Sequence, residues 1–134
     1  MKVGIIGASF ARAAYLPALR HVAGAEVVAI ASGRLSSARA AAEEFGVPHA
    51  YDDWQDMLDR HAFDLVCIAT PTVLHAPQAL AAIAKGAHVI CEKPTAMDAA
   101  EAKAMWVAAE AAGRVHMIDH ELRFNPNRAR IATM

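Results

Sequence analysis

The chain has 134 residues, which fits one domain with a single core, and none of its apolar runs reaches the roughly 20 residues that span a bilayer. Its formal net charge is -1 and its lysines and arginines are scattered, which argues against a nucleic-acid partner and against an anionic membrane surface. No secretory leader is evident after Met1, so we expect a cytoplasmic protein.

Cysteine and histidine usage predicts no metal site. Cys67 and Cys91 each lie inside an apolar, strand-like run, which is typical of buried reduced thiols; a disulfide or a catalytic nucleophile is the alternative. The 7 histidines form no recognisable ligand set. His116 and His120 are four residues apart, but on a segment expected to be a strand, where that spacing does not make a clamp.

The first element is an apolar strand over residues 3–6 that turns through small residues into a helical pattern reaching residue 22. Free backbone N–H groups and a positive dipole end at such a turn favour an anion, most simply a pyrophosphate. The expected contacts are Gly7, Ala8, Ser9, Phe10 and Ala11.

The turn departs from the usual glycine fingerprint, because Ser9 stands in place of the second glycine and Arg12 in place of the third. We expect Ala11 to supply the close helix packing instead, and a purely structural turn is the alternative. Pro17 should kink this helix or delay its start.

The second strand, over residues 26–31, is followed by Ser32 and Arg34, about 25 residues after Gly7. An NAD site usually carries an acid here, whereas a hydroxyl and an arginine accommodate a 2′-phosphate. We therefore favour NADP over NAD as the cofactor. The alternative is that Arg34 is a solvated loop cation and the acid is simply missing.

The clearest strand spans residues 63–70 and is stopped by Pro71. If the sheet reverses direction beside it, Thr70 and Pro71 border the cofactor. His75 would lie in the same crevice, or else it is a packing or capping residue at the start of a helix over residues 76–85.

The next strand, from residue 88, runs directly into Glu92, Lys93 and Pro94. The carboxyl ends of parallel strands face the ligand crevice, so Lys93 is expected to point at a bound molecule. As a cation it would stabilise a developing alkoxide or, if burial lowers its pKa, pass a proton. The alternative is that Glu92 and Lys93 are ordinary polar residues at the end of a strand.

The whole pattern is a βαβ series with strands near residues 3, 27, 49, 65, 88 and 116. It predicts an α/β fold, a doubly wound parallel sheet of Rossmann type with strand order 3-2-1-4-5-6. All candidate residues then gather on one edge of the sheet, including Arg123, which follows the last strand.

Three segments resemble the nucleotide-binding half of the glucose-fructose oxidoreductase, inositol dehydrogenase and rhizopine-catabolism (Gfo/Idh/MocA) family. They are Ala69-Thr70-Pro71 with His75, residues 86–94 ending in Glu92-Lys93-Pro94, and residues 120–124. The resemblance implies NAD(P)-dependent hydride transfer to or from sugars, cyclitols or related hydroxyl compounds. It also implies that Lys93 is catalytic. The cofactor contacts that it implies come from the turn at Gly7, from Thr70 and Pro71, and from Glu92.

The family continues into a substrate domain, so we expect residues 1–124 to be the NAD(P)-binding domain and residues 125–134 to start the crossover. With the substrate domain absent, the fragment alone should bind nucleotide but be inactive, and apolar surface near the sixth strand should favour a homo-oligomer. Two alternatives remain: a stand-alone, non-catalytic nucleotide-binding or interaction module, and a structural α/β domain with an empty crevice.

Overall fold

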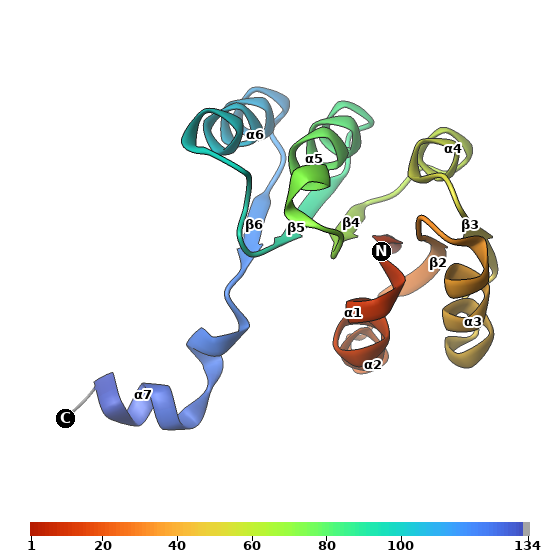
Figure 1. The fold of residues 1–134 in the computed structure, drawn as a ribbon, viewed down its shortest axis with the longest axis horizontal. Helices are drawn as coiled ribbons and strands as arrows, with labels where there is room; N and C mark the ends of the chain where they lie inside the picture. Colours follow the sequence, from red (N-terminus) through yellow and green to blue (C-terminus); the bar gives the residue numbers. More distant parts are fainter. Residues whose placement is uncertain (133–134) are drawn as a thin grey trace.

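The computed structural model describes residues 1–132, which form a six-stranded, fully parallel sheet with helices on its faces (Figure 1). The strand order is β3-β2-β1-β4-β5-β6, which confirms the predicted topology. The strands are β1 Lys2–Ile6, β2 Glu26–Ala31, β3 His49–Tyr51, β4 Leu65–Ile68, β5 His88–Glu92 and β6 His116–Asp119. Apart from the exposed Lys2 at the start of β1, the central strands β1 and β4 are apolar and buried, because both of their faces are covered.

Two helical layers cover the sheet (Figure 1). One layer packs α1 Ala8–Ala13, α2 Tyr15–Leu19 and α3 Leu35–Phe45 against side chains such as Ile5 and Cys67. The other packs α4 Trp54–Arg60, α5 His75–Ala84 and α6 Ala99–Ala112 against the opposite side chains, such as Ile6 and Ile68. Alternation along each strand therefore feeds two separate apolar cores.

The first helix is shorter than the sequence predicts, because it breaks at Ala14 into α1 and α2. Pro17 has no N–H for the carbonyl of Ala13, and its ring crowds that carbonyl, so the break falls where the expected kink should lie. A 3-10 turn, η1 Thr72–Leu74, also precedes α5 and replaces the loop predicted there.

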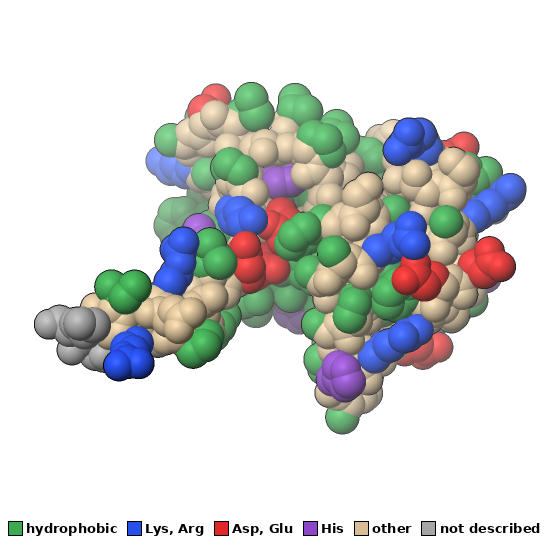
Figure 2. All heavy atoms as spheres, turned by 60° about the horizontal axis from the view of Figure 1, so that its bottom comes forward, with side chains coloured by type: hydrophobic (Ala, Val, Ile, Leu, Met, Phe, Trp, Pro, Cys, Tyr) green, Lys and Arg blue, Asp and Glu red, His purple; other side chains and the backbone are tan. Residues whose placement is uncertain are grey.

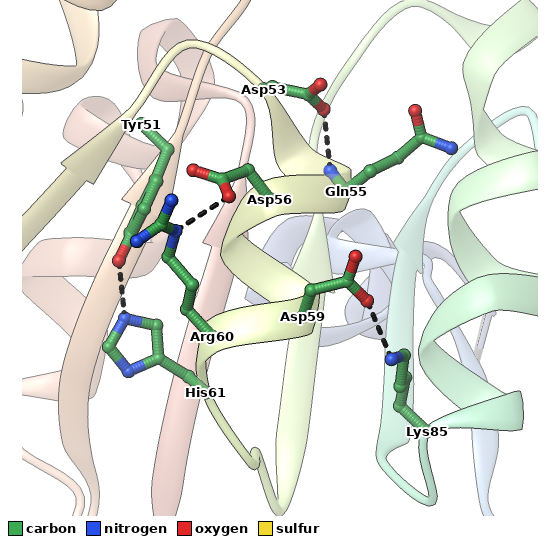
Figure 3. Close-up of polar contacts among 8 residues, drawn as sticks. All are labelled: Tyr51, Asp53, Gln55, Asp56, Asp59, Arg60, His61 and Lys85. Carbon is green, nitrogen blue, oxygen red and sulfur yellow. Dashed lines mark hydrogen bonds and ion pairs between the residues drawn. The ribbon is translucent and has the colours of Figure 1, made fainter.

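The edge formed by β3 and α4 is joined to its neighbours by polar contacts (Figure 3). The carboxylate of Asp53 accepts from the backbone N–H of Gln55 at 2.7 Å, which is the predicted cap of α4. Asp59 pairs at 2.7 Å with Lys85, which lies at the end of the neighbouring helix α5 in the same layer. The hydroxyl of Tyr51 lies 2.7 Å from Nε2 of His61, so the short edge strand is tied to the end of α4.

The opposite end of the sheet is less covered. From β6 the chain passes through η2 Glu121–Phe124 to α7 Pro126–Ala132, an arm that extends away from the helical layers (Figure 1). Met117 on β6 is 50% exposed and Phe124 on the arm is 84% exposed. The last helix was expected over residues 127–134, of which residues 133 and 134 lie outside the described part. Among residues 1–132, no helix is long and apolar enough to cross a membrane.

Candidate functional site

The carboxyl ends of all six strands lie on one edge of the sheet, because the strands are parallel. Ile6 pairs in register with Ala31 on one side and with Ile68 on the other. The first residues past the strands continue this alignment, since Gly7 N donates to the carbonyl of Ala31 at 2.8 Å and Ala69 N donates to that of Ile6 at 2.7 Å. The turns predicted to form the site are therefore neighbours.

Gly7 stands at the closest approach between two of these turns. Its φ of 111° lies in the region that favours glycine, and a Cβ built there would overlap the carbonyl of Ala69. Ala11 is fully buried in the α1 layer, so it supplies the close packing expected of it. Its side chain, like that of the nearly buried Ala8, faces the core rather than the solvent side of the turn.

A cavity of about 330 Å³ opens between the start of α1 and the start of α3. Its lining combines the turn residues Ala8 and Ser9 with two arginines and two serines, and it contains no acid: Ala8, Ser9, Arg12, Arg34, Ser36, Ser37 and Ala40. Arg12 is partly neutralised by its ion pair with Glu44, whereas α3 begins after Arg34 without a side-chain cap. The arrangement offers cationic and N–H donors to an anion.

Sequence reasoning found Ser9 and Arg34 but did not select Arg12, Ser36 or Ser37 as site residues. The serine pair at the start of an alanine-rich helix was the available clue, because uncapped helix starts and hydroxyls are frequent anion ligands. Ser32 does not line this cavity.

Ser32 instead lines a second, mostly apolar cavity of about 70 Å³, together with Thr70. The other walls are Ile6, Gly33, Asp52, Trp54, Leu74 and Gln78. Gln78 is fully buried; its Oε1 accepts from the Thr70 hydroxyl at 2.7 Å, but its Nε2 has no partner among the described residues. A buried amide donor left open beside a cavity is positioned for an acceptor on a ligand or a water. Trp54, predicted as core, is partly buried and contributes to both the core and this cavity.

Lys93 lies on the same edge as the glycine turn. Its Nζ is 5.7 Å from the ring centroid of Phe10, 3.6 Å from Oε2 of Glu92 and 3.2 Å from Oε1 of Glu121. Figure 2 shows acidic and basic side chains together where the arm joins the body of the molecule. Glu121, which follows β6, was missed by the sequence analysis.

The carboxylate of Glu121, followed by that of Glu92, raises the pKa of the Lys93 ammonium above its ordinary value. The condition under which Lys93 would pass a proton, a pKa lowered by burial, is therefore not met in this structure. Its side chain is 41% exposed and lies between two anions, so it is a fixed cation.

Glu92 is a buried carboxylate, 7% exposed, whose oxygens are already engaged. Oε1 accepts from the hydroxyl of Tyr15 at 3.2 Å, and Oε2 accepts from the backbone N–H of Lys93 at 3.2 Å. Burial, then the neighbouring carboxylates of Asp119 and Glu92, raises the pKa of Tyr15, so this hydroxyl stays a donor. Tyr15 was also missed, because an aromatic residue in a helix resembles ordinary core.

His75 joins the loop after β4 to the loop after β5. Its ring is 1% exposed, with Nδ1 2.8 Å from the carbonyl oxygen of Pro94 and Nε2 2.8 Å from that of Thr70. We therefore propose a supporting role for His75 in place of the direct cofactor contact expected from sequence. Pro71 is exposed before η1, and Arg123 is exposed on η2, the turn that also carries Glu121.

Both cysteines are free and buried, as predicted, and burial above all raises the pKa of Cys67 and of Cys91 to about 12. Neither thiol is a plausible nucleophile at that pKa. Within residues 1–132, no group of three or more histidine, cysteine, aspartate or glutamate side chains is arranged to hold a metal ion.

Comparison with known proteins agrees with this geometry. A family model described as the NAD-binding Rossmann fold of an oxidoreductase family, GFO_IDH_MocA, matches residues 1–120. Over 127 residues the chain is 35% identical to the 4-carboxy-2-hydroxymuconate-6-semialdehyde dehydrogenase of Sphingobium sp. (strain NBRC 103272 / SYK-6), covering 95% of this chain and 40% of that protein.

It is also 36% identical over 125 residues to the D-apiose dehydrogenase of Paraburkholderia graminis, covering 93% of this chain and 33% of that enzyme. Among solved structures, the 3-ketoreductase KijD10 of Actinomadura kijaniata in complex with NADP superposes with a TM-score of 0.90 at 33% identity. That match covers 100% of this chain and 43% of KijD10. The chain thus spans well under half the length of the proteins it matches.

Proposed function

The chain belongs to the Gfo/Idh/MocA oxidoreductase family, whose NAD(P)-binding Rossmann domain it forms, and on that premise we propose that it holds NADP for hydride transfer. The substrate we propose is a sugar, cyclitol or related hydroxyl compound, the class to which the substrate of the matched D-apiose dehydrogenase belongs. One observation carries the proposal. The Lys93 ammonium lies 5.7 Å from the ring of Phe10, a side chain of the turn that would cradle the dinucleotide.

The phosphate end of the cofactor fits the 330 Å³ cavity. Arg34 with the hydroxyls of Ser36 and Ser37 would hold a 2′-phosphate, and the backbone of Ala8 and Ser9 would face the pyrophosphate. An NAD site would normally carry an acid at this place, and the cavity lining contains none. NADP is therefore preferred, with NAD as the weaker ligand.

The base end fits the smaller cavity. Its volume of about 70 Å³ accepts the edge of a flat ring rather than a whole base. The open Nε2 of Gln78 would donate to a ring nitrogen, while the carboxylate of Asp52 would accept from an exocyclic amine. Thr70 orients Gln78 by donating its hydroxyl to Oε1, which leaves the amide donor facing the cavity.

When bound, the nicotinamide gives or takes a hydride at C4. Lys93, as a fixed ammonium, would donate a hydrogen bond to the substrate oxygen and lower the free energy of a developing alkoxide. Glu92 would hold the backbone of Lys93, and the buried ring of His75, which lies between the carbonyls of Thr70 and Pro94, would support the loops on either side of the crevice.

Calorimetric titration with NADP and with NAD tests the proposal. We expect NADP to bind with the higher affinity, and heat release from neither ligand at millimolar concentration would contradict nucleotide binding. A thermal-shift measurement with both nucleotides provides an independent check, since a ligand that binds only the folded state raises Tm.

We further propose that residues 1–124 are the nucleotide domain and that the segment from residue 125 leads into a substrate domain, with this part inactive by itself. The support is the partly exposed end of the sheet, where Met117 and Phe124 present apolar surface that a packed domain would cover. The same surface favours self-association into a homo-oligomer, which light scattering over a concentration series would detect. Two buried free thiols agree with a reducing, cytoplasmic location.

A further inference from the structure

Lys93 has two carboxylate neighbours that come from different elements and differ in what else they bind. Glu92 precedes it on β5, is buried, and already accepts from the hydroxyl of Tyr15 and from the backbone N–H of Lys93. Its Oε2 is 3.6 Å from Nζ, which is longer than a good hydrogen bond. Glu92 therefore contributes charge but does not fix the direction of the ammonium.

Glu121 is placed differently. It lies on η2, beyond β6, and its Oε1 is 3.2 Å from Nζ of Lys93, within hydrogen-bonding distance. Its side chain is 40% exposed. The carboxylate nearest to the ammonium thus comes from the turn after β6, and not from the Glu-Lys-Pro segment after β5.

A lysine side chain has a flexible four-carbon stem, so its head needs several contacts to stay in one place. Three groups face it: the ring of Phe10 from α1, the carboxylate of Glu92 from β5 and that of Glu121 from η2. Of the two carboxylates, only that of Glu121 pairs with the head at hydrogen-bonding distance.

We propose that Glu121 is the positioning residue for Lys93, holding its ammonium over the Phe10 ring as a permanent hydrogen-bond donor to the substrate oxygen. The inference rests on the proposed function, because it assigns Lys93 to the hydride-transfer site. In this arrangement Lys93 never acts as the base that removes a hydroxyl proton, and another group must take that part when an alcohol is oxidised.

The electrostatics agree with the geometry. The hydrogen bond to Glu121 is the largest influence raising the pKa of Lys93, ahead of the charge of Glu92. Reciprocally, Lys93 lowers the pKa of Glu121, and the neighbouring His120 lowers it further. Each partner therefore keeps the other in its charged form across the neutral range.

Reductive ¹³C-methylation of the four lysines, followed by NMR titration of their methyl signals, measures the proposal directly. Lys93→Arg assigns the Lys93 signal. We expect that signal to lie upfield because of the Phe10 ring, and to titrate above the ordinary pKa of a lysine side chain. In Glu121→Gln, the Lys93 pKa should fall and the upfield shift should shrink.

Asp59→Asn is the matched control, because it removes the carboxylate of another surface pair, in which Asp59 lies 2.7 Å from Lys85. It should remove the Asp59–Lys85 pair and leave the Lys93 signal unchanged. Glu121→Asp should restore part of the Lys93 shift. An unchanged Lys93 pKa and an unchanged upfield shift in Glu121→Gln would overturn the proposal.

The signals of Lys2, Lys85 and Lys103 report in the same spectra whether each variant is folded. The measurement needs no nucleotide, so a failure of NADP to bind would contradict the proposed function without affecting this result. Conversely, nucleotide binding with a Lys93 signal that does not respond to Glu121 would contradict only the positioning role.

Discussion

Arg34 is the side chain on which the preference for NADP depends, and its removal gives the sharpest test of the cofactor proposal. It lines a 330 Å³ cavity without an acid, whose other arginine, Arg12, is already paired with Glu44. A hydrogen bond to a charged group contributes about 1.5–3 kcal/mol. Because Arg34 is solvent-exposed, we take the lower part of that range, about 1.5–2 kcal/mol, which is roughly a 10- to 30-fold loss of NADP affinity in Arg34→Ala.

The NAD affinity of Arg34→Ala should stay within about twofold of the parent, because NAD has no 2′-phosphate for the guanidinium to bind. Arg34→Asp should go further and reverse the preference, since a carboxylate accepts from the ribose 2′-OH and repels a phosphate. Arg39→Ala is the matched control, an exposed arginine on the same helix that does not line the cavity. Calorimetric titration of the parent and the three variants measures these affinities. Equal losses of affinity for NADP and for NAD in Arg34→Ala would refute the reasoning.

Three further predictions concern stability. Gly7→Ala should lower the free energy of unfolding by more than the about 1–3 kcal/mol typical of backbone strain, because its Cβ would also overlap Ala69. Gly24 has φ +78° and open space for a Cβ, so Gly24→Ala should show the cost of backbone strain alone. Equal losses of unfolding free energy in urea for the two variants would contradict an added cost of overlap at Gly7. Burial, followed by nearby positive charge, lowers the pKa of His61 in the folded protein. Unfolding therefore takes up protons, and stability falls as the pH drops below the ordinary pKa of 6.5. The Tm of His61→Gln should fall less steeply than that of the parent between about pH 7 and 5, and equal slopes for the two proteins would exclude this role. Asp98→Ala should cost about 0.5–2 kcal/mol in urea unfolding, because its carboxylate caps α6 at 2.8 Å, and an unchanged midpoint would show that the cap contributes nothing.

The sheet order could be predicted from the sequence because each strand is an apolar run that ends at a glycine, a proline or a charge. The parallel topology then places residues such as Gly7, Arg34 and Lys93 on one edge without any knowledge of side-chain direction. Local details of the backbone were harder to predict from the sequence. The division of the first helix at Ala14 depends on how strongly Pro17 crowds the preceding turn, which residue spacing does not measure.

Partners of the site residues were the part that sequence could not supply. Tyr15 and Glu121 lie far along the chain from the groups they contact, and these two and Gln78 each resemble an ordinary helix or loop residue. Whether an amide is left unpaired, or a carboxylate reaches an ammonium, depends on rotamers that only packing determines. His75 shows the same limit, because the sequence left a crevice contact and a packing role as alternatives, and the burial of its ring is visible only in the structure.

The departure of the turn from a full glycine fingerprint also has a structural consequence. Phe10, a large residue in a turn that usually favours small ones, packs edge-on against Tyr15 at 5.9 Å between ring centroids. Tyr15 donates to Glu92, Glu92 lies beside Lys93, and the Lys93 ammonium returns to the Phe10 ring at 5.7 Å. These four contacts form a closed ring of side chains that joins α1, α2 and the end of β5. We expect a shift of the turn on binding a phosphate to move the ring beside the lysine, and so to link cofactor binding to the placement of the lysine through contiguous side chains.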